Sequence, residues 1–398
     1  MFLHRALHPQ DDRSVVLHQG KFKKTASLSE AVFMITGMTI GAGVLGIPYV
    51  VARAGLVIGL LEILFLGIVM LFLNLMVGEV AALSGDNMQL SGLAGKYLGH
   101  TAKMVFSITF MFGSYGVLLA YIVGIGDAMA ALIGGSAAMW SIIFWSLGSF
   151  IVWRGLSTVS IFEKTFGFFV ILFIVGLSLY LLPHISTVNL TLGSAGSFFL
   201  PLGVILFALD GAPAVAEAHA LLPKQPRLFR RAVIIGTLIP MAVYFLFTLA
   251  VVGSQGLNAD PIATVGLGAR YGGFVKILGS LFAIVAMGTA FVGRGTAFKD
   301  TLRWDHKLPD WAAELTVFVV PLGLFLAGVT NFVQILSIVG GVFLALEAII
   351  MVGVYVQARR HHTARSNAFR LTHPLWLELC VLTVFTSAAV LSIIKLTI

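Results

Sequence analysis

The sequence predicts an all-α integral membrane protein with eleven transmembrane helices. Of its 398 residues, 59% are hydrophobic and only 11% are charged, and the mean hydropathy is +1.00. A soluble domain cannot bury so much apolar surface, so lipid must be the solvent for most of the chain. Eleven apolar stretches are long enough, or nearly so, to cross about 30 Å of hydrocarbon. Two of these stretches are interrupted by glycine, which indicates broken helices.

The eleven stretches follow one another along the chain with short polar connections. A helix rises about 1.5 Å per residue, so about 20 residues span the membrane, and the fourth and ninth stretches are shorter than this. The expected spans are residues 29–52, 56–83, 104–133, 138–153, 163–183, 199–221, 232–256, 274–298, 312–328, 332–356 and 375–396.

The distribution of basic residues predicts the orientation of the chain. If the N-terminus is cytoplasmic, 21 of the 25 Lys and Arg residues lie on the cytoplasmic side, as the positive-inside rule requires. We therefore expect a protein of the plasma (cytoplasmic) membrane with its N-terminus inside. The loops account for the net charge of +8, so nucleic acid is not an expected partner. Cys380 is the only cysteine, which excludes disulfides and cysteine-based metal clusters.

The chain divides into an N-terminal segment and one membrane domain. Residues 1–28 are polar and basic without the apolar core of a signal peptide, and predict a cytoplasmic tail. Within residues 29–398, the first ten spans form two sets of five, 29–183 and 199–358, and each set begins with an interrupted helix. Because five is odd, the second set is inverted, an arrangement known from secondary transporters. Residues 375–396 are an extra C-terminal helix.

Several segments resemble those of a known family of transporters. They are residues 39–49 (TIGAGVLGIPY), 78–80 (GEV), 90–99 (LSGLAGKYLG), 120–126 (AYIVGIG), 207–215 (FALDGAPAV), 297–300 (AFKD) and 339–343 (VGGVF). Over essentially its whole length the chain resembles the amino acid/auxin permease family and the related aromatic amino acid permeases. Both belong to the amino acid–polyamine–organocation superfamily. The resemblance implies an 11-span amino acid permease with inverted five-helix repeats and discontinuous first and sixth helices.

The first interruption is the expected binding site for the carboxylate of the substrate. Gly41, Ala42 and Gly43 let the chain unwind and let a ligand approach the backbone. The second half-helix then starts with free N–H groups and positive partial charge. The alternative is that these small residues only permit close helix packing. The substrate-binding candidates are Thr39, Gly41, Ala42, Gly43, Ser114, Tyr121, Phe207, Asp210 and Gly211.

Asp210 stands at the second interruption. A carboxylate at membrane depth costs several kcal/mol unless it is paired or protonated, so a functional role is the default. It can accept the ammonium group of the substrate, carry a coupled proton, or cap the second half-helix, and these roles are compatible. Many members of the resembled family carry a neutral residue here, so Asp210 would reflect a substrate or coupling mode of this branch.

The coupling ion is expected to be a proton rather than sodium. In the sodium-coupled members of the resembled fold, oxygens of the first break and hydroxyls of span eight form a cation site. This chain has Thr289 followed by Ala290 there, so one hydroxyl is missing. Arg294 follows, either as a charge that replaces sodium or as a residue that reaches the cytoplasmic interface.

Acidic residues complete the coupling and gating candidates. Glu62 and Glu347 lie within spans, as proton relays or as partners in helix–helix hydrogen bonds. Glu79 and Glu217 lie at cytoplasmic ends of spans, where a gate is expected. The full set of coupling and gating candidates is Asp210, Glu62, Glu79, Glu217, Thr289, Arg294 and Glu347.

The expected function is secondary active import of amino acids by alternating access, and not an enzymatic reaction. The sequence has no metal-ligand pattern, no Gly-x-Ser-x-Gly and no phosphate-binding loop. Alternatives are a sodium-coupled or uncoupled carrier or exchanger of amino acids or polyamines, and an amino acid sensor that does not transport. No cofactor is expected beyond a proton gradient or sodium. The preferred amino acid, the stoichiometry and the oligomeric state stay open.

Overall fold

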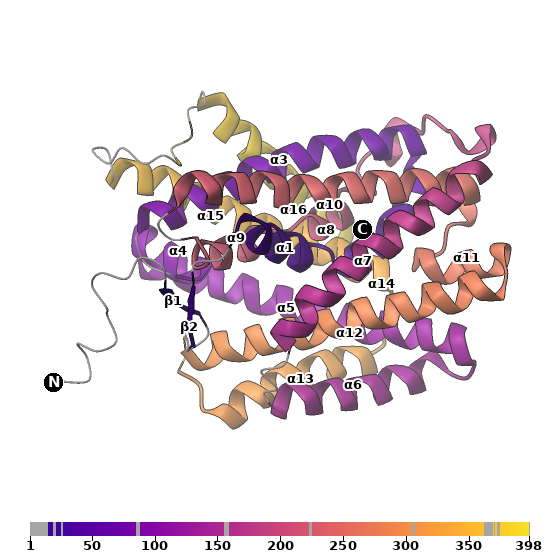
Figure 1. Cartoon of the computed structure of the whole chain (residues 1–398), viewed down its shortest axis with the longest axis horizontal. Coiled ribbons are helices and arrows are strands. Elements are labelled where there is room, and N and C mark those ends of the chain that lie inside the picture. The colour runs from indigo at the N-terminus through magenta and orange to yellow at the C-terminus, as the bar shows by residue number, and fades with distance from the viewer. Residues whose placement is uncertain are drawn as a thin grey trace.

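The computed structural model of the chain is an elongated bundle of helices (Figure 1). It describes residues 15–18, 21–24, 27–84, 88–154, 159–222, 225–304, 307–361, 369, 371 and 375–397. Two short strands, β1 (Val15–His18) and β2 (Lys21–Lys24), pair antiparallel in the N-terminal segment, and the sequence did not predict this hairpin. Most of the expected tail, residues 1–28, lies outside the described residues.

The helices of the first half follow the expected spans. The first span is split in two, and a short helix that we did not expect, α4, precedes the third span. In chain order they are α1 (Leu28–Thr39), α2 (Gly43–Ala54), α3 (Leu56–Ser84), α4 (Leu90–Leu98), α5 (His100–Ile133), α6 (Ala137–Arg154) and α7 (Val159–Leu181). Three short 3₁₀ turns follow: η1 (Leu182–His184), η2 (Thr187–Asn189) and η3 (Ala195–Ser197).

The second half repeats this plan with a split first span and a second unexpected short helix, α11. Its elements are α8 (Leu202–Ala208), α9 (Ala212–His219), α10 (Pro226–Gln255), η4 (Gly256–Asn258), α11 (Ala263–Tyr271), α12 (Gly273–Trp304) and α13 (Asp310–Leu326). The tenth span is α14 (Phe332–Ile338), a π-helical turn η5 (Val339–Leu344) and α15 (Ala345–His361), and the extra helix is α16 (Leu375–Thr397).

Length and hydropathy show that the chain is an integral membrane protein. Within the described ranges, eight helices are long and apolar enough to cross a membrane, and the bent pair α1/α2 makes nine. The two remaining expected spans are shorter, because the apolar stretch Phe168–His184 of α7 and η1 and the 17-residue α13 fall below the length of a full span. The number eleven stays a prediction for these two helices.

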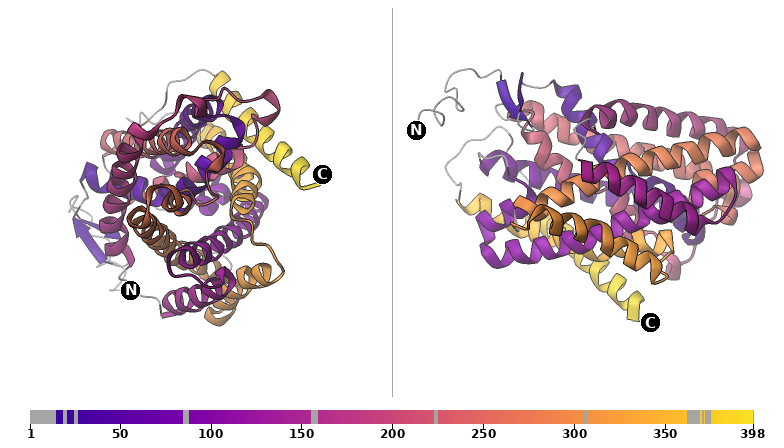
Figure 2. Two further views of the ribbon diagram at one scale, coloured as in Figure 1. Left: turned by 90° about the vertical axis from the view of Figure 1, so that its right-hand side faces the viewer. Right: turned by 90° about the horizontal axis from the view of Figure 1, so that it is seen from below.

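The broken helices lie at the centre of the bundle. Of the 18-residue apolar window in α8 and α9, 78% is buried, against 22% in α6 and 28% in α16. Figure 2 accordingly shows α16, in yellow, running obliquely on the outside of the bundle. The short helices α4 and α11 lie at opposite ends of the molecule (Figure 1). The centre is therefore lined by segments that do not complete a regular helix.

Corresponding helices of the two repeats pack against each other. The most extensive helix–helix contacts join α5 to α12, the third spans of the two sets, and α3 to α10, the second spans. The first spans also touch, through α2 and α8. Two inverted repeats related by an axis in the membrane plane produce such pairing. The two breaks thereby meet near the middle of the bundle.

Candidate functional site

The first break separates α1 and α2, whose axes differ by 55°. α1 ends at Thr39 and α2 begins at Gly43, so Ile40, Gly41 and Ala42 form the break. The N-cap residue of α2 is Ala42, whose side chain makes no capping hydrogen bond, which leaves the first N–H groups of α2 for a ligand or water. The positive end of the helix dipole lies at the same place, so the break suits a carboxylate.

The second break separates α8 and α9. α8 ends at Ala208 and α9 begins at Ala212, with Leu209, Asp210 and Gly211 between them. The N-cap residue of α9 is Gly211, and the Ala212 N–H donates to Asp210 Oδ1 at 3.3 Å, as in an Asx turn. This bond occupies one carboxylate oxygen of Asp210, so it is compatible with a second role of this side chain.

The two breaks touch each other. A Cβ on Gly43 would lie 2.5 Å from both Cα and Cβ of Ala208, so no larger residue fits without a shift. A Cβ on Gly211 would lie 3.0 Å from Thr39 Oγ1 and 3.0 Å from Asn74 Nδ2. The candidates Thr39, Gly43 and Gly211 are thus brought together. The hydroxyl of Thr39 donates to a carbonyl of its own helix at 2.7 Å.

Tyr244 of α10 links both breaks, and sequence reasoning missed it. Its side chain is fully buried. Its hydroxyl oxygen lies 3.0 Å from the carbonyl oxygen of Thr39 and 3.0 Å from that of Ala208. These carbonyls end α1 and α8, where partners within the helix are missing. In the sequence Tyr244 is one of eight tyrosines and stands inside a 30-residue apolar helix, so no local pattern marks it.

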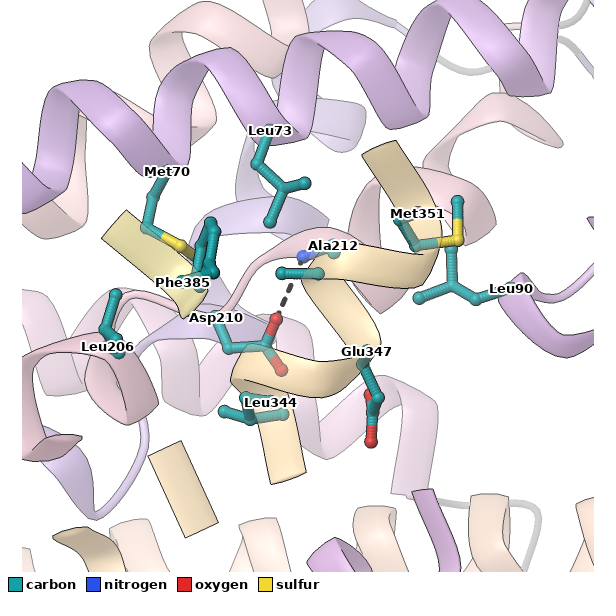
Figure 3. Close-up of a pocket in the computed structure, with 11 residues that line it drawn as sticks. Met70, Leu73, Leu90, Leu206, Asp210, Ala212, Leu344, Glu347, Met351 and Phe385 are labelled. Carbon is teal, nitrogen blue, oxygen red and sulfur yellow. Dashed lines mark hydrogen bonds between the residues drawn. The ribbon is translucent and has the colours of Figure 1, made fainter. Parts of the chain in front are cut away.

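A small cavity lies beside the second break (Figure 3). Its volume is about 20 Å³, which is room for about one water molecule and not for an amino acid. Asp210 and Glu347 form the acidic part of its wall, and the rest is largely apolar. The apolar wall includes Met70 and Leu73 of α3, Leu206 of α8, Met351 of α15 and Phe385 of α16.

Glu347 and Arg294 complete a charged cluster around Asp210. Glu347 of α15 is 5% exposed, and its Oε1 is buried with no hydrogen-bond partner among the described residues. Arg294 of α12 is partly buried and stacks on Phe110, with the guanidinium carbon 4.6 Å from the ring centre. Arg294 is near enough to interact electrostatically with both carboxylates. Two acids and one base thus share the interior of the bundle.

Of the other substrate-binding candidates, Tyr121 and Phe207 have contacts at the breaks. The Tyr121 hydroxyl oxygen would lie 3.6 Å from a Cβ on Gly41, and the carbonyl of Phe207 accepts the N–H of Asp210 at 3.4 Å. Ser114 is fully buried, and its hydroxyl donates at 2.7 Å to a carbonyl one turn earlier in α5. Phe207 packs against the π-helical turn. A Cβ added to Gly340 of that turn would lie 2.9 Å from the Cβ of Phe207.

The hydroxyl of Thr289, the expected cation ligand of span eight, is directed at its own helix. The hydroxyl of Thr289 lies 2.9 Å from the Val285 carbonyl and 3.2 Å from that of Ala286, so it donates to its own helix. In the part of the chain that the structure describes, no group of three or more His, Cys, Asp or Glu side chains is placed to hold a metal ion.

Glu62 and Glu217 lie apart from the charged cluster. Glu62 is buried in α3, 12 residues before Asn74, and is therefore about 18 Å from it along the helix. Glu217 is partly buried near the end of α9, five residues after the start of that helix at Ala212, or about 7.5 Å along it. Neither lines the cavity.

Glu79 belongs to a polar network near the ends of α3 and α15. It is 1% exposed, and its Oε2 accepts the N–H of Leu371 at 2.8 Å. Its Oε1 lies 3.6 Å from Nε of Arg359, and Nη1 of the same arginine donates to the hydroxyl of Tyr355 at 2.8 Å. The network ties α3 to α15 and to the segment before α16.

Known proteins resemble this chain over most of its length. The sequence model of the tryptophan/tyrosine permease family matches residues 24–392. The chain is 30% identical over 348 residues to tyrosine-specific transport system 2 of Haemophilus influenzae, covering 78% of this chain and 82% of that protein. It is 24% identical over 355 residues to glutamine transporter 2 of Aliivibrio fischeri, covering 84% and 89%.

A solved structure has the same fold. The crystal structure of MhsT in complex with L-phenylalanine aligns with a TM-score of 0.63 at 15% identity, over 93% of this chain and 98% of that one. At this identity the likeness extends to the fold alone. It confirms the predicted fold class.

Proposed function

The chain belongs to the tryptophan/tyrosine permease family and is an integral membrane transporter of amino acids, not an enzyme, and we propose that it imports them together with protons. Import proceeds by alternating access, with the two repeats rocking about the breaks. The observation that carries the proposal is the pair Asp210 and Glu347, which line the cavity at the second break, with Arg294 near enough to interact electrostatically with both.

The proposed substrate is an aromatic amino acid. Its carboxylate binds the N–H groups at the start of α2, at Gly41 to Gly43, and its ammonium group faces Asp210. The Tyr121 hydroxyl borders the same space. The tyrosine-specific relatives and the phenylalanine of MhsT support an aromatic side chain. The glutamine transporter among the relatives makes a polar neutral side chain the alternative.

The coupled proton belongs to the charged cluster. With both carboxylates ionised, Asp210, Glu347 and Arg294 have a net charge of −1, and one bound proton makes the cluster neutral. A net charge in the bilayer interior is costly. While the site is closed to water, the protein therefore favours the form of the cluster with one proton. A water molecule in the cavity would connect the two carboxylates. The substrate is a zwitterion and adds no net charge to the site, so the form with one proton stays favoured while the substrate is bound. Asp210 faces the ammonium group and Glu347 holds the proton, so substrate and proton occupy the protein together.

Sodium is not part of the proposed mechanism. A sodium ion is a hard cation that takes several oxygen ligands, and the cation-site segment of span eight offers one hydroxyl, on Thr289. That hydroxyl is already directed at carbonyls of α12. Arg294 brings a fixed positive charge to the same region, which repels a second cation. These features support a proton as the coupling ion.

The proposed direction is inward across the plasma membrane, with the N-terminus in the cytoplasm. The basic residues of the connecting loops support this orientation. The Glu79–Arg359 pair then lies on the cytoplasmic side and forms part of the inner gate. Breaking the Glu79–Arg359 pair would release α3 from α15 and let the substrate and the proton leave.

The test separates accumulation from exchange in proteoliposomes. Glu347→Gln keeps the shape of the side chain but cannot carry the proton as an acid. We expect it to lose accumulation driven by a pH gradient and to keep exchange of labelled for unlabelled substrate. The matched control is Glu62→Gln, a buried acid about 18 Å from Asn74 along α3. If Glu62→Gln uncouples accumulation and Glu347→Gln does not, the cluster is the wrong site.

A further inference from the structure

Two helix ends meet at one buried hydroxyl group. The last carbonyls of a helix have no partner within it and carry the negative end of its dipole. At Ala208 the ordinary donor would be the N–H of Ala212, four residues on, but that N–H donates to Asp210. Instead the hydroxyl of Tyr244 lies 3.0 Å from the Ala208 carbonyl and 3.0 Å from that of Thr39.

This position is one where a cation can bind. In transporters with discontinuous helices, unwound carbonyls and the C-terminal ends of half-helices coordinate sodium or a proton. Here the carbonyls of Thr39 and Ala208 point at one common atom, and that atom is a phenol oxygen. A phenol carries a single hydrogen, which the two carbonyls share or take in turn. The negative ends of α1 and α8 therefore face a neutral donor.

The donor is held firmly in place. The side chain of Tyr244 is 0% exposed, and α10 packs closely against both α1 and α2. Gly43 at the start of α2 lies directly against Ala208, since a Cβ there would be 2.5 Å away. Little freedom remains for the two carbonyls to separate while the hydroxyl bridges them.

We propose that the Tyr244 hydroxyl takes the place of a bound monovalent cation between the two half-helix ends. Tyr244 is then a positioning residue that makes the geometry of both breaks independent of sodium. The inference rests on the proposed function, in which no sodium is bound, and it gives that property a structural cause. Because the Tyr244 hydroxyl is neutral, the coupled proton is carried by the cluster of Asp210, Glu347 and Arg294 and not by this group.

The test is Tyr244→Phe, which removes the hydroxyl and keeps the ring. The control is Tyr180→Phe on α7, where the side chain is 49% exposed and outside the breaks. Uptake and melting temperature are measured in choline, sodium and lithium media at fixed pH and membrane potential. We expect wild type and Tyr180→Phe to behave alike in all three media. In choline, Tyr244→Phe should lose uptake about tenfold, the effect of one lost buried hydrogen bond.

The response of Tyr244→Phe to sodium and lithium tests the inference. Sodium or lithium should restore uptake of Tyr244→Phe several-fold and raise its melting temperature, and should not change that of wild type. Unchanged uptake in choline would overturn the inference. So would a loss that no cation relieves, because the hydroxyl would then be only structural. Sodium stimulation of wild type would instead contradict the proposed coupling mode, whatever the variant does relative to it.

Discussion

Gly43→Ala tests whether the contact between the two breaks is as tight as the structure has it. The added Cβ would lie 2.5 Å from Cα and Cβ of Ala208. Carbon atoms in contact prefer a separation of about 3.5–4.0 Å, so α2 and α8 must separate by about 1–1.5 Å. Overpacking of this kind costs about 1–3 kcal/mol of stability. A shift of about 1 Å at a binding site reduces activity by about a hundredfold.

The matched control is Gly37→Ala in α1. A Cβ there meets nothing within 4 Å, and alanine is the better helix former by about 1 kcal/mol. The assay is thermal unfolding of the purified variants in detergent, together with uptake in proteoliposomes. We expect Gly43→Ala to lower both the melting temperature and uptake, and Gly37→Ala to lower neither. Wild-type uptake by Gly43→Ala, or equal losses in both variants, would refute the reasoning.

Three further predictions concern the first break, the polar network and the loop before α11. Gly41→Ala places a Cβ 3.6 Å from the Tyr121 hydroxyl, an ordinary contact, so the melting temperature should not change. The methyl group occupies space where the substrate carboxylate is proposed to bind, so a ligand titration should show binding weakened about tenfold. Glu79→Gln weakens the pairing with Arg359, and thermal unfolding should show a loss of about 1–3 kcal/mol; no loss would contradict the network. Burial raises the pKa of Asp260, so the folded state holds that proton more tightly than the unfolded state and stability falls as the carboxyl ionises. Asp260→Asn should therefore gain stability over wild type at about pH 7 relative to about pH 4, and a difference independent of pH would contradict this.

The fold follows from local signals in the sequence. The second span was expected at residues 56–83, and α3 is Leu56–Ser84. Glycines mark the first break, and Asp210 followed by Gly211 marks the second. Such signals suffice because a membrane helix must form all its backbone hydrogen bonds within itself. A break in the helix therefore requires residues that favour it, and these are visible in the local sequence. The short helices α4 and α11 were missed because each has only nine residues.

The site depends on contacts that the sequence does not reveal. Tyr244 is 205 residues from Thr39 and 36 from Ala208, so its role appears only once α10 is folded against both breaks. Phe385 lines the cavity although α16 was expected to be only an additional helix. Ser114 stays a prediction: its buried hydroxyl donates to a carbonyl of its own helix, as a hydroxyl in an apolar helix commonly does, and the sequence does not show this bond.

The central claim is that an amino acid and a proton enter together without sodium. The most direct measurement follows the pH inside sodium-free vesicles that contain the purified protein and a trapped pH dye, with no initial pH gradient. External L-tyrosine, or whichever amino acid competes best for binding, is then added. The account predicts that the interior becomes acidic as labelled substrate enters, and that Glu347→Gln abolishes this change. Substrate entry without acidification, or entry that requires sodium, would contradict the account.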